Sequence, residues 1–155
     1  MNVVLKLIVI MPVIIALSGC SSSYLKDKQQ SRSEDANFRK QIKPDSSTSP
    51  AVLALIKKAR IDALNGNIDK AMLRLERAVR IEPANASVWH YMSKLFLQQE
   101  NYKQASGYAS KSITLAGDNK NLRIDNWRII GHSRYRLGNV KGAQQAQDII
   151  NKLQQ

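Results

Sequence analysis

Residues 86–119, ASVWHYMSKLFLQQENYKQASGYASKSITLAGDN, contain the pattern that decides the fold of this 155-residue chain. Trp89 is followed four positions later by a small residue, Ser93, and two further small residues, Ala105 and Ser112, lie seven positions apart. The same positions recur 34 residues earlier and 38 residues later. The matching residues are Leu55, Ala59, Ala71 and Ala78 in the earlier copy and Trp127, Gly131, Ala143 and Ile150 in the later one.

Each copy contains two stretches in which apolar residues recur at helical spacing, as at Val52, Ile56, Ala59 and Ala63. A short Gly or Asn turn separates the two stretches, and the small residues allow paired antiparallel helices to approach closely. Helices are therefore predicted at about 51–65, 68–81, 86–99, 102–116, 122–137 and 140–154. The polar run 118–121 is expected in the loop before the fifth helix.

This 34-residue period resembles the tetratricopeptide repeat (TPR). The middle copy is the best match, through Trp89, Ser93, Phe96, Tyr102 and Ala105. The resemblance extends from residue 52 to about 151 and implies an all-α domain, residues 51–155, of three stacked helix-turn-helix (TPR) repeats that form a short right-handed solenoid. The repeats would span about 52–85, 86–119 and 124–155.

Departures from the pattern indicate where the array ends. Met92 and Phe96 of the middle copy are replaced by Lys58 and Asp62 in the first copy, which has no preceding repeat to cover that face. Arg134 occupies the Phe96 position in the third copy, and we expect its side chain to reach solvent along the last pair. The last helix must cap the stack with its polar outer face, which contains Gln144, Gln145, Gln147 and Asp148.

The N-terminus resembles a bacterial lipoprotein signal. Its apolar run, residues 7–17, is too short to span a membrane, which needs about 20 apolar residues. Leu17-Ser18-Gly19-Cys20 resembles the lipobox, in which the cysteine is lipidated and becomes the new N-terminus. Residues 1–19 are therefore predicted to be a signal peptide and Cys20 the lipidation site. A plain N-terminal anchor helix is the alternative.

The residue after the cysteine is Ser21 and not Asp, which by resemblance to enterobacterial sorting favours the outer membrane. The protein would then face the periplasm, with surface exposure as the alternative. The whole chain has 24 Lys and Arg against 12 Asp and Glu, a formal charge of +12. Because this compartment excludes nucleic acid, the charge points to an acidic protein or, second, to an anionic envelope polymer.

Residues 20–50 are predicted to be the lipidated cysteine and a disordered tether. Only five residues from Ser21 to Pro50 are apolar, so this segment cannot offset its conformational entropy by burial. As a flexible coil it would average roughly 30 Å end to end and stretch to about 100 Å. A short helix over residues 33–42 that forms on contact with a partner is a weaker possibility.

The sequence contains no catalytic pattern. One cysteine and two histidines cannot form a Cys-rich zinc module, and the cysteine is predicted to be lipidated. There is no Gly-rich phosphate loop and no G-x-S-x-G motif. We therefore expect no enzyme, no metal and no cofactor.

The TPR resemblance implies that the first helix of each pair lines a concave groove. The basic and aromatic residues predicted there are Arg60, His90, Tyr91, Lys94, Arg128, His132, Tyr135 and Arg136. They suit an acidic or carboxylate-bearing segment, because Arg can bind a carboxylate through two hydrogen bonds. The alternative is that they are ordinary solvated residues of a basic protein. The two-carboxylate clamp of chaperone-binding TPR domains is not matched, because apolar or aromatic residues occupy its positions: Ile56, Tyr91 and Ile129.

A lipid anchor, a tether and a compact helical domain are similar in plan to TPR lipoproteins that activate class A penicillin-binding proteins. The resemblance implies a lipid-anchored interaction module that binds and regulates another envelope protein, such as a peptidoglycan synthase. The alternatives are a pilotin-like factor and a scaffold for pilus, secretion-channel or outer-membrane assembly.

Overall fold

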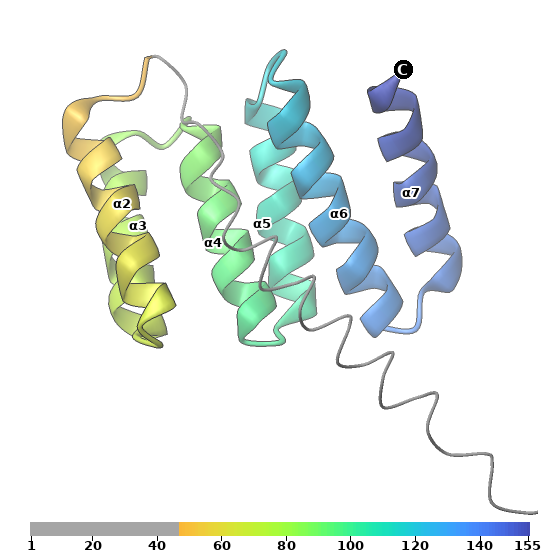
Figure 1. Cartoon of the computed structure of the whole chain (residues 1–155), viewed down its shortest axis with the longest axis horizontal. Coiled ribbons are helices and arrows are strands. Elements are labelled where there is room, and N and C mark those ends of the chain that lie inside the picture. The colour runs from red at the N-terminus through yellow and green to blue at the C-terminus, as the bar shows by residue number, and fades with distance from the viewer. Residues whose placement is uncertain (1–46) are drawn as a thin grey trace, which may run out of the picture. The chain divides into compact units, whose positions relative to one another are not determined.

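The computed structural model describes residues 47–155, and within them it contains six α-helices and no strand (Figure 1). The helices are α2 (Pro50–Leu64), α3 (Ile68–Ile81), α4 (Ala86–Gln98), α5 (Tyr102–Leu115), α6 (Lys120–Arg136) and α7 (Val140–Gln154). The predicted signal peptide, Cys20 and the tether as far as residue 46 lie outside the described residues. No described helix is both long enough and apolar enough to cross a membrane.

The helix boundaries lie within two residues of those predicted. The largest difference is at α6, which begins at Lys120, so that half of the predicted loop 118–121 is helical. The cause is Asn119, whose side chain accepts a 3.1 Å hydrogen bond from the backbone N–H of Leu122 and so caps the helix. At α2, Ser49 is the capping residue and Pro50 is the first helical residue, so the fold extends into the last residues assigned to the tether.

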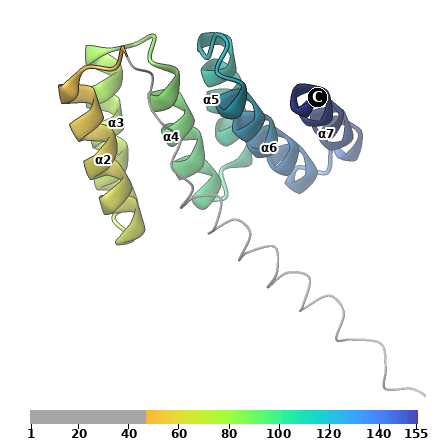
Figure 2. The ribbon, with the colours of Figure 1, turned by 45° about the horizontal axis from the view of Figure 1, so that its top comes forward.

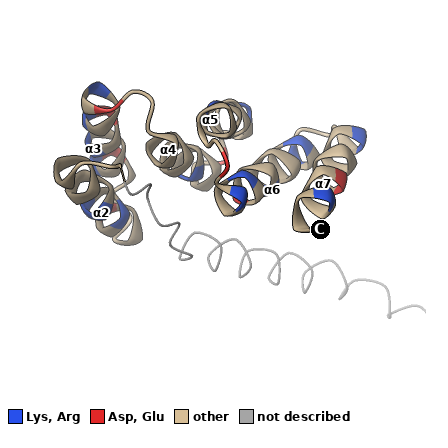
Figure 3. Cartoon of the chain, turned by 90° about the horizontal axis from the view of Figure 1, so that it is seen from above, with Lys and Arg blue, Asp and Glu red and all other residues tan. Residues whose placement is uncertain are grey.

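Consecutive helices pack as the antiparallel pairs α2–α3, α4–α5 and α6–α7, and the pairs stack side by side (Figures 1 and 2). The first helices of neighbouring pairs touch, since α4 packs against both α2 and α6. The second helices α3 and α5 are not in comparable contact. The stack therefore curves toward α2, α4 and α6. In the view from above, α2 lies below α3 and α6 lies below α5 (Figure 3). The predicted all-α fold of three stacked helix pairs is confirmed.

Small residues allow the close helix packing that the sequence predicts. Ala105 and Ala109 of α5 are fully buried against Ile129 and Ile130 of α6. A Cβ atom added to Gly131 would lie 3.2 Å from the Cβ of Ala146, so α6 and α7 approach closely at this point and even an alanine would require Ala146 to shift. The repeated small positions thus set the distance between helices.

Polar residues close both ends of the stack. Lys58 is exposed, whereas Asp62 accepts a hydrogen bond from Arg74 of α3. Arg134 does not simply extend into solvent: its Nη1 donates a 3.1 Å hydrogen bond to the carbonyl oxygen of Gly142 in α7. This contact explains how an arginine is tolerated where the middle copy has Phe96. The outer glutamines of α7 are exposed, as expected for a terminal cap: Gln144, Gln145 and Gln147.

Candidate functional site

The concave face is formed by α2, α4 and α6, and its centre is α4. This helix is buried over most of its surface because neighbours lie on both sides of it. Of the predicted groove residues on α4, His90 is 1% exposed, Tyr91 4% and Lys94 6%. The structure therefore places all three side chains inside the packing and not on an open surface.

A buried hydrogen-bond network explains the position of His90. The Nδ2 of Asn126 in α6 donates to Ser112 Oγ at 2.7 Å, and that hydroxyl donates to the Ala86 carbonyl oxygen at 2.8 Å. The amide of Asn126 is thereby oriented with its Oδ1 toward His90, 2.8 Å from the ring Nδ1. His90 Nδ1–H is the donor in this contact, because Oδ1 can only accept. The network joins α4, α5 and α6, so it fixes two neighbouring repeats in register.

Burial lowers the pKa of His90 to about 4. The hydrogen bond to Asn126 acts against this shift, the positive charge of Lys94 adds to it and the negative charge of Asp125 opposes it. Among the described residues, the second ring nitrogen, Nε2, has no hydrogen-bond partner. The imidazole is therefore neutral at pH 7, and His90 supports the groove without contributing charge to it.

Acidification should destabilise the domain through His90. The unfolded chain takes up the proton near pH 6.5 and the folded chain only near pH 4, so stability is complete above pH 6.5 and is lost as the pH falls between these values. Urea unfolding at pH 7 and pH 5 should show a loss of about 2 kcal/mol in the wild type. The variant His90→Gln should lack most of this loss; an equal loss in both proteins would contradict the assignment.

Arg128 lies on the concave side of α6 and forms an ion pair with Asp125, one turn earlier on the same helix. The guanidinium uses only Nη1 in this contact, so its remaining N–H donors can still bind a second carboxylate. Arg60 of α2 is half-buried, two repeats away. Arg60 and Arg128 thus supply one partly exposed basic side chain from each outer first helix, whereas Lys94 of α4 is buried.

The other predicted groove residues gather near the C-terminal end of α6. Arg136 lies 4.7 Å above the ring of Tyr102 and 3.6 Å from the carboxylate of Glu100, and the His132 and Tyr102 ring centroids are 5.9 Å apart. Glu100 adopts a left-handed conformation (φ 57°) at the turn position where the other pairs have glycine. Tyr135 is 56% exposed. The predicted groove residues therefore include two groups. His90, Tyr91 and Lys94 are buried on α4. His132, Tyr135 and Arg136 lie near the C-terminal end of α6, where Tyr135 and Arg136 are exposed.

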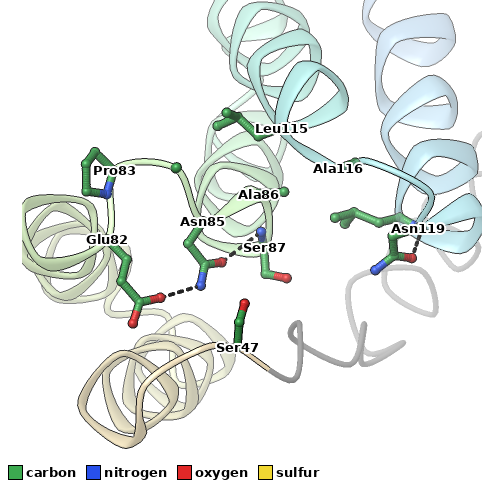
Figure 4. Close-up of a pocket in the computed structure, with 11 residues that line it drawn as sticks. Ser47, Glu82, Pro83, Asn85, Ala86, Ser87, Leu115, Ala116 and Asn119 are labelled. Carbon is green, nitrogen blue, oxygen red and sulfur yellow. Dashed lines mark hydrogen bonds between the residues drawn. The ribbon is translucent and has the colours of Figure 1, made fainter.

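A pocket of about 350 Å³ lies at the opposite end, where the chain enters the domain (Figure 4). Asn85 Nδ2 donates to Glu82 at 2.7 Å and to the hydroxyl of Thr48 at 2.9 Å, and the Ser49 N–H donates to Glu82 at 2.9 Å. Hydrogen bonds from Ser49 and Asn85 lower the pKa of Glu82, although partial burial acts in the opposite direction. This network fixes Thr48 and Ser49 beside the first turn of α4.

Within residues 47–155 no three His, Cys, Asp or Glu side chains are grouped as metal ligands. The residues that sequence reasoning missed are Asn126, Ser112 as a hydrogen-bond partner, and the Thr48–Asn85 contact. Asn126, Thr48 and Asn85 look like exposed helix or loop residues in the sequence, and Ser112 looks like a small packing residue. Their hydrogen bonds join distant segments, so only the packing reveals them.

No family model matches the sequence, and a search of curated proteins finds no relative. Solved structures do match. The globular C-terminal domain of LpoP from P. aeruginosa is 27% identical, with a TM-score of 0.64 over 66% of this chain and 97% of that domain. The N-terminal domain of stress-induced protein-1 (STI-1) from C. elegans is 10% identical, with a TM-score of 0.60 over 72% of this chain and 100% of that one.

A third match is the second TPR of Spaghetti (RPAP3), solved with the HSP90 peptide SRMEEVD. It is 16% identical, with a TM-score of 0.60 over 79% of this chain and 98% of that one. These similarities confirm the TPR-type helical repeat fold inferred from the 34-residue period. The fold is that of protein interaction domains, and the three neighbours are not enzymes.

Proposed function

We propose that this protein is a lipid-anchored periplasmic interaction module that binds and regulates another envelope protein, such as a peptidoglycan synthase. The observation that supports it most is the TPR-type stack, in which the outer first helices α2 and α6 each have a partly exposed arginine, Arg60 and Arg128. The similarity to the LpoP domain extends over 97% of that domain. It supports the proposal alongside the lipoprotein signal predicted from the N-terminal sequence. In this proposal Cys20 holds the lipid at the outer membrane and the domain has no enzymatic activity.

The proposed ligand of the groove is an acidic or carboxylate-bearing protein segment. Residues 51–155 contain 17 Lys and Arg against 8 Asp and Glu, and the bases concentrate on the outer pairs (Figure 3). The peptide bound to the RPAP3 domain is itself acidic, with the sequence SRMEEVD. A chaperone tail is not proposed, because Ile56, Tyr91 and Ile129, at the positions of the two-carboxylate clamp, are all buried here.

Two other assignments remain as second candidates: a pilotin-like factor, and a scaffold for pilus, secretion-channel or outer-membrane assembly. An anionic envelope polymer is the second candidate ligand. All of them use the same anchor and the same basic domain, so the position of the partner distinguishes them. A peptidoglycan synthase lies across the periplasm, whereas an outer-membrane assembly lies in the plane of the anchor.

Shortening the tether tests the proposal. Residues 24–45 are deleted and Cys20 is retained; the deletion stops there because Thr48 is buried in the fold. Removing 22 residues shortens the maximum reach by about 70 Å. Crosslinking in cells should then no longer recover a peptidoglycan synthase, and an equally long Gly-Ser segment in place of residues 24–45 should restore it. Retention of a partner in the outer membrane by the shortened protein would instead support the assembly roles.

A further inference from the structure

The turn between α6 and α7 forms an exposed apolar corner, which we define by Tyr135, Leu137 and Val140. Their exposed fractions are 56%, 57% and 64%. These three large hydrophobic residues lie within six positions of one another. They differ from the rest of this end of the stack, because the outer face of α7 is polar. A cluster of this kind is typical of an interaction surface.

The equivalent turn in the preceding pair is covered by protein. Tyr102 is the first residue of α5 as Val140 is of α7, and Tyr102 lies under the Arg136 guanidinium at 4.7 Å. The end of α6 thus packs on the α4–α5 turn. No described helix follows α7 to pack on the α6–α7 turn in the same way, yet that turn is more apolar than its counterpart. The exposed apolar residues of the α6–α7 turn therefore suit contact with a segment of another protein.

The charge around the corner is mainly positive, although the carboxylate of Glu100 lies 3.6 Å from Arg136. From Asn126 to Gln147 the sequence contains no Asp or Glu, and it contains four bases: Arg128, Arg134, Arg136 and Lys141. An acidic segment is the electrostatic complement of this surface. Tyr135 also follows His132, another predicted groove residue, by one turn of α6.

We infer that the Tyr135–Leu137–Val140 corner anchors apolar side chains of the partner's acidic segment where that segment leaves the concave groove. The inference rests on the proposed function and adds a second requirement to it: the segment has large apolar residues beside its acids. A protein is favoured over a lipid surface because the matching turn of the middle pair is covered by a helix end. Membrane contact is therefore an outcome of the test.

Photo-crosslinking in cells tests the location. Benzoylphenylalanine replaces Val140, Leu53 or Leu73 in the full lipidated chain. Leu53 lies two turns before Arg60 on the same face of α2 and is 39% exposed, and Leu73 is a matched control on α3, with 63% exposure. We expect the adducts from positions 140 and 53 to contain the same protein, and position 73 to give none. An adduct at position 53 without one at 140 would overturn the inference about the corner and leave the proposed function standing. Absence of a protein adduct at both positions would overturn both.

Substitution then measures the contribution of the corner. With the crosslinked protein purified, Leu137→Ser plus Val140→Ser should weaken binding at least tenfold, because two apolar side chains lose their burial. Leu73→Ser should leave the affinity unchanged, and all three side chains are already exposed, so folding should be retained. If the double variant instead binds the protein normally but no longer binds phosphatidylglycerol vesicles, the corner is a membrane contact and the inference is overturned.

Discussion

Replacing Asn126 with alanine should lower the free energy of unfolding by about 3–5 kcal/mol. Asn126 is fully buried and bonds to His90 and Ser112 from two other helices. Its removal leaves the buried His90 N–H without a partner among the described residues, takes a donor from Ser112 and opens a cavity. Each unsatisfied group costs about 1–3 kcal/mol, and the cavity adds to that. A small domain has a total stability of only about 5–15 kcal/mol, so this loss would be a large part of the total.

Urea unfolding monitored by circular dichroism is the appropriate measurement. Asn121→Ala is the matched control, since Asn121 lies on the same helix but is exposed. The control should remain within about 0.5 kcal/mol of the wild type. If Asn126→Ala is no less stable than Asn121→Ala, the network does not hold the second and third repeats together.

The second large effect concerns binding. Arg60→Glu plus Arg128→Glu should weaken the affinity for the partner at least 100-fold. Each change removes a charge-assisted hydrogen bond worth about 1.5–3 kcal/mol and adds repulsion toward an acidic segment. Lys94 is left intact, because it is 6% exposed and a buried glutamate there would confuse unfolding with loss of binding. The dissociation constant is measured by calorimetry at one fixed salt concentration.

The stability of this variant must be measured alongside. Arg128→Glu removes the ion pair with Asp125 and places two like charges one turn apart on α6. A partly exposed pair of this kind contributes less than about 1 kcal/mol, so the domain should stay folded. A loss of binding with normal unfolding would then report on the groove itself.

Sequence periodicity was sufficient to predict the helices because TPR packing is local. Each pair is specified by its own small residues, such as Ala71 or Ala105, and by the next pair, so a 34-residue period contains nearly all the information. The start of α6 is an instructive error. The loop was predicted from a polar run, but Asn119 is itself a helix cap, and a cap permits the polar residues after it to be helical.

The site was harder to predict, because helical spacing gives the face of a residue but not its depth. His90 was assigned to the groove because it lies on the first helix of its pair. Whether such a residue is exposed depends on how closely α2 and α6 approach α4, and the buried partner Asn126 lies 36 residues away. The contact of Arg134 with Gly142 could not be predicted either, since it depends on how α7 packs against α6. The basic character of the face follows from composition, whereas its depth follows only from packing.

The most direct test of the central claim compares two double variants with equal changes in net charge. Arg60→Glu plus Arg128→Glu alters the concave face, and Lys70→Glu plus Lys103→Glu alters exposed residues of α3 and α5. The affinities of both for the purified partner are measured at the same ionic strength. A concave groove predicts a loss of at least 100-fold for the first and less than threefold for the second. Equal losses in both variants would show that binding depends on net charge alone and would contradict the account.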